Sequence, residues 1–146
     1  MAITEIPARG FKFELNTGTN GSPNWVPIAG IDTFSHTPTT NRADTRHFED
    51  GGRLRHWVAS RGDQFTLSGK RQEDPDTGDR DPGQEAVEAW AQEVGPGSIK
   101  QFRITSPGGN VLTFEASAEV TLFGGGNDDP ASWQVVIEVS GPISAA

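Results

Sequence analysis

The three histidines are the first side chains to consider, because imidazole binds metals and transfers protons near neutral pH. They stand at positions 36, 47 and 56, in or beside one long polar stretch. Two metal ligands on one helix or strand would be only a few residues apart, and these are not. We therefore expect no metal site at His36, His47 or His56.

An acidic stretch is similar in outline to a calcium-binding loop. Its carboxylates are Asp74, Asp76, Asp79 and Glu85. Pro75 interrupts the stretch, and Gly78 falls one place before the glycine at which an EF-hand loop turns. The pattern favours a solvated loop whose negative charges lie near the N-terminus of a helix.

No other set of residues has the spacing of a catalytic site. The serines lack the strand-turn-helix setting of a nucleophile elbow, and the glycines at 124–126 precede a predicted strand where phosphate binding would require a helix. With 20 acidic residues in the chain, any one pair of carboxylates is uninformative. The sequence predicts a protein that is not an enzyme and uses no cofactor.

Composition and charge favour a β-rich protein without a phosphate-binding surface. The 146 residues include 18 Gly and 10 Pro, and only 33% are hydrophobic, which is typical of many turns and long loops. The net charge is −8. Residues 70–146 carry thirteen acidic and five basic side chains, against seven of each in residues 1–69. Binding to nucleic acid through its phosphates would require a basic patch instead.

Cysteine content and hydropathy bear on location. The chain has no cysteine, so its redox compartment stays open. Residues 1–15 lack a basic region followed by an apolar run, and no stretch reaches the length that spans a bilayer. We expect one domain over residues 1–146, with no membrane partner.

A helix is predicted at about residues 81–94. Asp81 can cap it, Pro82 fits its first position, and Gln84 stands where a capping box places Glu or Gln. The Gly-Pro pair that follows predicts its end. A helix this short needs packing for stability, so we expect its apolar stripe to anchor it to the core. The stripe consists of Val87, Trp90, Ala91 and Val94.

Alternation of apolar and polar residues predicts the strands. The clearest alternation runs from Leu112 to Leu122, and a second, from Trp133 to Val139, completes a long hairpin with one apolar and one mainly polar face. The polar face would carry Glu115, Glu119 and Glu138. Shorter strands are predicted at residues 11–15, 25–28, 31–35, 65–69 and 102–104.

Residues 36–61 form a long polar region with few apolar anchors. Gly51-Gly52 near its middle suggests a turn between two arms of a protruding hairpin. Long loops of this kind are usually functional or become ordered on a partner, so we expect poor order in the free chain and contacts with a partner. The candidate contact residues are Arg42, Asp44, Arg46, Phe48, Arg53, Leu54, Arg55 and Trp57.

The predicted fold is mainly β, an antiparallel β-sandwich or barrel with one flanking helix and the protruding loop at residues 36–61. A small ligand-binding β-barrel without catalysis is the alternative. In that case Trp25, Trp57, Trp90 and Trp133 would line an internal cavity. Core packing is the more common use of buried tryptophan.

Five segments carry a resemblance to a known family. They are WVPIAGIDTF at 25–34, FEDGG at 48–52, QFTLSGKRQEDPDTGDRDPGQEAVEAW at 64–90, FRITSPGGNVLTFEASAEV at 102–120 and SWQVVIEVSG at 132–141. In this order and spacing they resemble the tail tube (major tail) proteins of long-tailed bacteriophages. The resemblance covers residues 11–141, and none of the segments is a catalytic signature.

The resemblance implies a virion structural protein that self-assembles into stacked, hexameric rings. The rings would form a hollow conduit for DNA ejection, and the polar face with Glu115, Glu119 and Glu138 would line the lumen. The long polar region at residues 36–61 would reach a neighbouring subunit or ring. Implied partners are further copies of the chain, other tail proteins at the tube ends and the tape measure protein, while DNA passes without specific binding. The implied location is the phage tail, after assembly in the host cytoplasm. Unlike some relatives, the chain has no immunoglobulin-like domain after residue 141, so surface display is not expected.

Overall fold

The computed structural model describes residues 3–19 and 21–145. Its strands are β1 (Lys12–Asn16), β2 (Trp25–Pro27), β3 (Ile31–Asp44), β4 (His56–Lys70), β5 (Lys100–Thr105), β6 (Val111–Thr121), β7 (Ser132–Val139) and β8 (Ser144–Ala145). One α-helix, α1 (Pro82–Ala91), occurs in this part of the chain, with short 3-10 turns η1 (Ala8–Gly10), η2 (Phe48–Asp50) and η3 (Gly95–Ser98). None of these described helices is long and apolar enough to cross a membrane.

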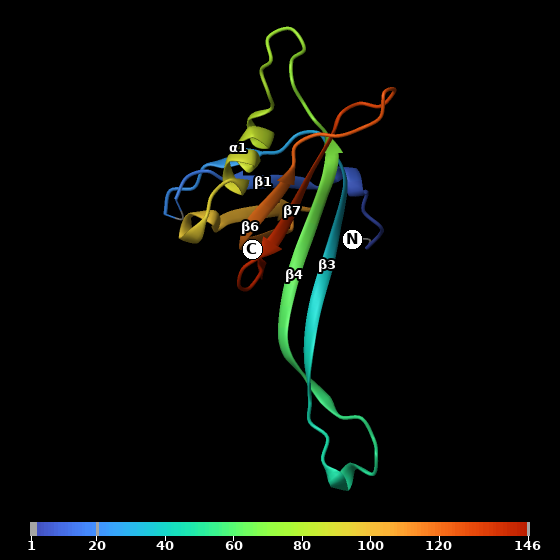
Figure 1. The fold of residues 1–146 in the computed structure, drawn as a ribbon. Coiled ribbons are helices and arrows are strands. Elements are labelled where there is room, and N and C mark those ends of the chain that lie inside the picture. The colour runs from blue at the N-terminus through green and yellow to red at the C-terminus, as the bar shows by residue number, and fades with distance from the viewer. Residues whose placement is uncertain (1–2, 20, 146) are drawn as a thin grey trace.

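The strands form a sheet in the order β2-β1-β5-β6-β7-β4-β3, and β8 also pairs with β6. Each of these pairs is antiparallel. The predicted hairpin of β6 and β7 is present, with Ala116 opposite Val139 and Thr121 opposite Gln134. The prediction of a mainly β, antiparallel fold with one flanking helix is confirmed (Figure 1).

The sheet curls, so that strands far apart in its order meet across the core. The ring centroid of Phe34 on β3 lies 4.9 Å from that of Phe11 and 5.2 Å from that of Phe13 on β1. Phe65 of β4 stacks on Phe114 of β6 at 5.1 Å. Of the two architectures left open by the sequence, the curled sheet is closer to a barrel than to a sandwich of two separate sheets.

Helix α1 begins where the sequence predicts. The Asp81 carboxylate accepts a hydrogen bond from the backbone N–H of Gln84 at 3.0 Å, and Pro82 is the first helical residue. Val87 and Trp90 are buried in the core, and Ala91 is half-buried. The N-terminal cap therefore fixes the helix so that this face lies against the sheet.

The helix ends earlier than predicted, and the assignment of Val94 as a core anchor is wrong. The backbone N–H of Glu93 bonds to the carbonyl of Trp90 at 3.1 Å, which tightens the last turn, and Val94 is already extended at φ −128°. The indole N–H of Trp90 donates to the carbonyl of Ser98 at 2.7 Å, which holds the following turn under the helix. Val94 lies outside this turn and is 85% exposed.

Gln84 does not complete a capping box but fastens α1 to the ends of two strands. Its side chain is fully buried. The amide Nε2 donates to the carbonyl oxygens of Ala29 and Lys70 at 3.0 and 2.9 Å, and Oε1 accepts from the backbone N–H of Gln72 at 3.1 Å. Both polar atoms of this buried amide therefore have hydrogen-bond partners, which offsets the cost of burying them.

A partly buried ion pair holds the 71–81 loop against α1. Arg80 donates two hydrogen bonds to Glu88, at 2.8 and 2.5 Å, and the indole N–H of Trp133 donates to the same carboxylate at 3.3 Å. Burial raises the pKa of Glu88, but the hydrogen bonds and charge of Arg80 lower it by more, so its pKa lies below the ordinary value. Glu88 is therefore held in its charged form.

Residues 36–61 are not a structureless loop. Strands β3 and β4 pair from Ile31 opposite Gly69 to Asp44 opposite His56, with register shifts between Ile31 and Thr33 and between Asn41 and Arg42. The resulting hairpin projects far from the body of the molecule (Figure 1). Its arms are mostly solvent-exposed within residues 36–44 and 56–61, so the burial that would produce an alternating sequence pattern is absent there.

Candidate functional surfaces

The far end of the β3–β4 hairpin exposes large apolar side chains. Phe48 is fully exposed, and Leu54 and Trp57 are 76% and 66% exposed. Apolar surface in water is unfavourable by about 25 cal/mol per Å² relative to a buried position. Exposed apolar side chains on a projecting element are typical of a surface that contacts another protein.

Charged side chains flank these apolar residues in the sequence. Arg46 Nη2 lies 2.9 Å from Asp44 Oδ2, and the Arg46 backbone N–H donates to Asp44 Oδ1 at 2.9 Å. These hydrogen bonds keep the pKa of the Asp44 carboxyl below its ordinary value. His47 lies 2.9 Å from Glu49 and 3.2 Å from Arg55. The remaining predicted contact residues, Arg42 and Arg53, are also exposed. The structure thus brings all eight predicted contact residues to the outer part of the hairpin.

A hollow of about 600 Å³ lies at this end of the hairpin. It is lined by Asp44, Arg46, His47, Phe48, Gly52 and Arg53. It is therefore part of the projecting hairpin and does not lie inside the curled sheet.

The alternative of a ligand-binding barrel requires the four tryptophans to share a cavity. Trp90 and Trp133 are each 1% exposed and belong to the packed core. Trp57 stands on the hairpin, and Trp25 lies at the sheet edge on β2. The four side chains do not meet, which disfavours that alternative.

Three exposed carboxylates lie on the side of the sheet that faces away from the core. Glu115 and Glu119 are on β6 and Glu138 is on β7, where it stands opposite Ser117. Residues next to them along the strands, such as Ala116 and Ile137, are fully buried. The alternation of the two strands therefore separates an anionic face from the core, as the sequence predicts.

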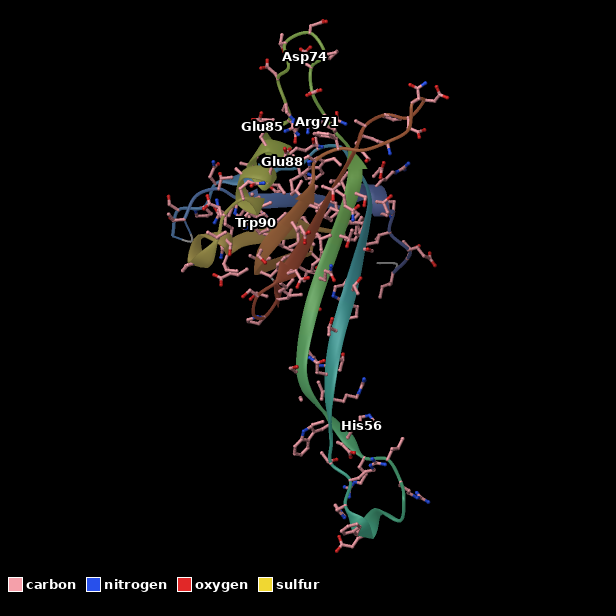
Figure 2. All side chains as sticks on the ribbon, viewed as in Figure 1. His56, Arg71, Asp74, Glu85, Glu88 and Trp90 are labelled. Carbon is pink, nitrogen blue, oxygen red and sulfur yellow. The ribbon has the colours of Figure 1, made fainter. Side chains whose placement is uncertain are left out.

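The other candidate side chains do not gather into a site. His36 Nε2 lies 2.7 Å from Asp63 Oδ1, and Asp74 accepts a hydrogen bond from the backbone N–H of Asp76 at 2.9 Å, which helps to lower its pKa. Figure 2 shows His56 on the hairpin and Asp74 at the opposite end of the molecule. Within residues 3–19 and 21–145, no group of three or more His, Cys, Asp or Glu could hold a metal ion.

One ion pair on the anionic face was not predicted from the sequence. Arg103 of β5 pairs with Glu14 of β1, and the two residues are 89 positions apart in the chain. No local pattern relates them, because strands β1 and β5 become neighbours only through the sheet order. This ion pair could have been predicted only if the order of the strands in the sheet had been known.

Comparison with known proteins relates the fold to phage-like tails. No model of a known protein family matches the sequence, and no curated protein matches it. A chain from the tail of an empty GTA particle, in a structure with C6 symmetry, matches with a TM-score of 0.74 and 16% identity, over 97% of this chain and 99% of that one. A chain from the virion of a native gene transfer agent particle gives 0.72 and 13%, with the same coverage. The chain has the fold of these proteins.

A third structure, the 6-fold symmetrised baseplate of the anti-feeding prophage, matches with a TM-score of 0.55 and 13% identity, over 100% of this chain and 97% of that one. The matches extend over nearly the whole length of both chains in each comparison. The resemblance to tail tube proteins is thereby confirmed for the fold.

Proposed function

We propose that this chain is a structural subunit of a phage-like tail tube, which assembles into stacked hexameric rings around a hollow conduit for DNA. The observation that carries the proposal is the projecting hairpin, whose exposed Phe48, Leu54 and Trp57 have no cover within the described part of the chain. The likeness to a tail chain in a C6-symmetric structure supports a six-subunit ring. The whole chain acts as one domain with a structural and not a catalytic role.

In this function the hairpin of one subunit contacts a neighbouring subunit. Burying three large apolar side chains against a partner would contribute several kcal/mol, at about 1.5–3 kcal/mol for each fully buried side chain. The surrounding charges, Arg42, Asp44, Arg46, Arg53 and Arg55, would set the register of the contact and the choice of partner.

The face with Glu115, Glu119 and Glu138 lines the conduit. Sixfold repetition turns each exposed carboxylate into a ring of negative charge. Duplex DNA carries one charge per about 1.7 Å of its axis, so a wall of the same sign repels it and a basic wall would bind it. At physiological salt the repulsion extends only about 8 Å, which keeps DNA from the wall and leaves the passage open.

The partners follow from this arrangement. They are further copies of the chain, other tail proteins at the two ends of the tube, and a tape measure protein inside it. The protein resides in the tail of the virion after assembly in the host cytoplasm, and DNA passes through it without specific binding.

Electron microscopy of concentrated protein tests the assembly. The unaltered chain is expected to form rings or tubes, and the triple variant Phe48→Ser, Leu54→Ser, Trp57→Ser is expected to remain small with an unchanged circular dichroism spectrum. The matched control is Val94→Ser, since Val94 is 85% exposed but lies on the body of the molecule. Tubes formed normally by the triple variant would contradict the proposed role of the hairpin.

A further inference from the structure

Arg103 lies on the anionic face, held by two neighbours. Phe102 and Ile104 are buried on either side of it, so the alternation of β5 directs Arg103 away from the core. Its Nη2 lies 2.9 Å from Glu14 Oε2, and its Nε lies 3.2 Å from Glu14 Oε1, which makes the pair two-pronged. The guanidinium carbon also lies 4.3 Å from the ring centroid of Trp25.

Arg103 lies close to the carboxylates of the anionic face. Arg103 stands opposite Thr113 of β6, while Glu115 stands opposite Gln101. Diagonal neighbours of this kind are about 7–8 Å apart, so Arg103 borders the proposed rings of carboxylates. A second basic residue of this face, Lys70, is likewise paired, with Asp32 at 3.3 Å.

A guanidinium is the side chain best suited to hold a phosphate. It is always charged and presents parallel N–H donors that fit two oxygens of one phosphate. Lys12, which also lies on this face of β1, offers only a point charge by comparison. Six released copies of Arg103 in each ring would bind passing DNA through its backbone.

We propose that Glu14 and Trp25 form a clamp that withholds the Arg103 guanidinium from DNA phosphates. Glu14 engages the Nε and Nη2 edge of the guanidinium, which is one of the edges that could hold two phosphate oxygens, and the Trp25 ring lies 4.3 Å from the guanidinium carbon. The side chains of Arg103 and Glu14 are 28% and 19% exposed, so the pair is partly shielded from water and from screening ions. The inference rests on the proposed function, because the phosphates in question are those of DNA that passes through the conduit.

Solution NMR of the unassembled chain tests the clamp without requiring a tube. The Nε–H signal of Arg103 is followed while inorganic phosphate is added to millimolar concentration. In the unaltered chain the signal is expected to stay in place, and in Glu14→Gln it is expected to move with phosphate concentration. Glu119→Gln, which removes the same charge from the same face, is the matched control and should leave the signal unresponsive. An unresponsive signal in Glu14→Gln would overturn the clamp.

Assembled tubes test the consequence for DNA. Tubes of Glu14→Gln are expected to retain a short duplex about tenfold more strongly at low salt than unaltered tubes, with a steeper loss of binding as salt rises. The double variant Glu14→Gln, Arg103→Gln should return to the unaltered level. Equal retention by the single and double variants would refute the role of Arg103.

Glu119→Lys distinguishes a failure of the proposed clamp from a failure of the assignment of this face to the conduit. If Glu119→Lys tubes retain DNA and Glu14→Gln tubes do not, the clamp is wrong and the conduit face stands. If neither retains DNA, the assignment of this face to the conduit is wrong.

Discussion

Trp90 joins three parts of the molecule at one side chain. It belongs to α1, its ring stacks on Phe102 of β5 at 6.2 Å, and its indole N–H donates to the carbonyl of Ser98 in η3. It is also 1% exposed. At this site, apolar packing and a hydrogen bond both depend on the same residue.

Replacing Trp90 with Ala is expected to lower the free energy of unfolding by about 3–5 kcal/mol, because it leaves a large cavity between α1 and the sheet. Trp90→Phe should lose less, since the smaller phenyl ring still fills part of the site although the hydrogen bond is lost. Val94→Ala, at an exposed position, should change stability by no more than about 0.5 kcal/mol. Urea titration followed by fluorescence measures all three. An unfolding midpoint unaffected by Trp90→Ala would mean that α1 is peripheral.

The charge of Glu88 makes a pH-dependent contribution to stability. Since the pKa of Glu88 is lowered in the folded protein, its stabilising effect is present above the ordinary carboxyl value of about 4.3 and is lost as pH falls through the folded value. Glu88→Gln should therefore cost about 2 kcal/mol at neutral pH, the scale of a hydrogen bond to a charged group, and less near pH 3. Urea unfolding at both pH values measures the difference. Glu85→Gln, at an exposed position of the same helix, is the control and should leave the free energy of unfolding unchanged at both pH values. If the loss of stability in Glu88→Gln were as large at pH 3 as at neutral pH, the ion pair with Arg80 would be excluded as its cause.

At the scale of the element, sequence patterns predicted the helix start that a capping residue fixes and the strands of which one face is buried in the core. The start of α1 was predictable because Asp81 and Pro82 act locally, and the strands β6 and β7 because burial of one face imposes alternation. The end of α1 depends on where Trp90 finds its acceptor at Ser98, which is a tertiary contact. A local pattern does not contain that information.

A protruding hairpin was predicted at residues 36–61, but the length of its paired strands was not, and for a different reason. Beyond the body of the molecule β3 and β4 pair only with each other, and both of their faces meet solvent. Nothing there requires apolar residues at every second position, so the sequence reads as a loop. The eight candidate contact residues were chosen because a long polar stretch with few apolar anchors favours contact with a partner, and their role stays a prediction.

Shortening the hairpin should separate folding from assembly. Replacing residues 41–60 with an Asn-Gly turn would join Thr40 to Arg61, which are opposite each other in the register, by a two-residue connection. The core contains no residue from the removed part, so the thermal midpoint is expected to fall little, while rings and tubes disappear. Calorimetry and electron microscopy measure the two effects. Unfolding of the shortened chain would show that the hairpin is part of the fold's stability, and tubes of normal appearance would show that assembly does not use it.

At the scale of the whole molecule, different surfaces lie at its two ends. The hairpin projects from one end, and the acidic loop around Asp74 projects from the other (Figure 2). Contacts between unlike surfaces of successive copies form a closed ring when the rotation between copies closes, and otherwise they can be repeated along an axis. This asymmetry fits a tube whose length is set by something other than the subunit.

Charge reversal on the face with Glu115, Glu119 and Glu138 tests whether this face lines the conduit. Particles in which Glu115, Glu119 and Glu138 are all changed to Lys are expected to assemble but to eject DNA slowly or to stall, because three rings of six lysines in each hexamer would hold the phosphates. Three exposed carboxylates elsewhere, Asp76, Glu85 and Glu93, provide a control with the same change in net charge. Normal ejection through tubes that carry all three conduit changes would show that this face does not line the passage.

The place of β4 in the sheet also governs the order of folding. On one edge β4 pairs with β3, its predecessor in the chain, and on the other with β7, which is synthesised only after α1, β5 and β6. The β3–β4 ribbon can form early on the ribosome, but Phe65 and Leu67 gain their neighbours Ile137 and Val135 only when residues 132–139 emerge. A nascent chain that stops short of β7 thus presents an unpaired strand edge with apolar residues. Such incomplete chains are expected to aggregate or engage chaperones, because this edge of β4 stays unpaired until β7 is made.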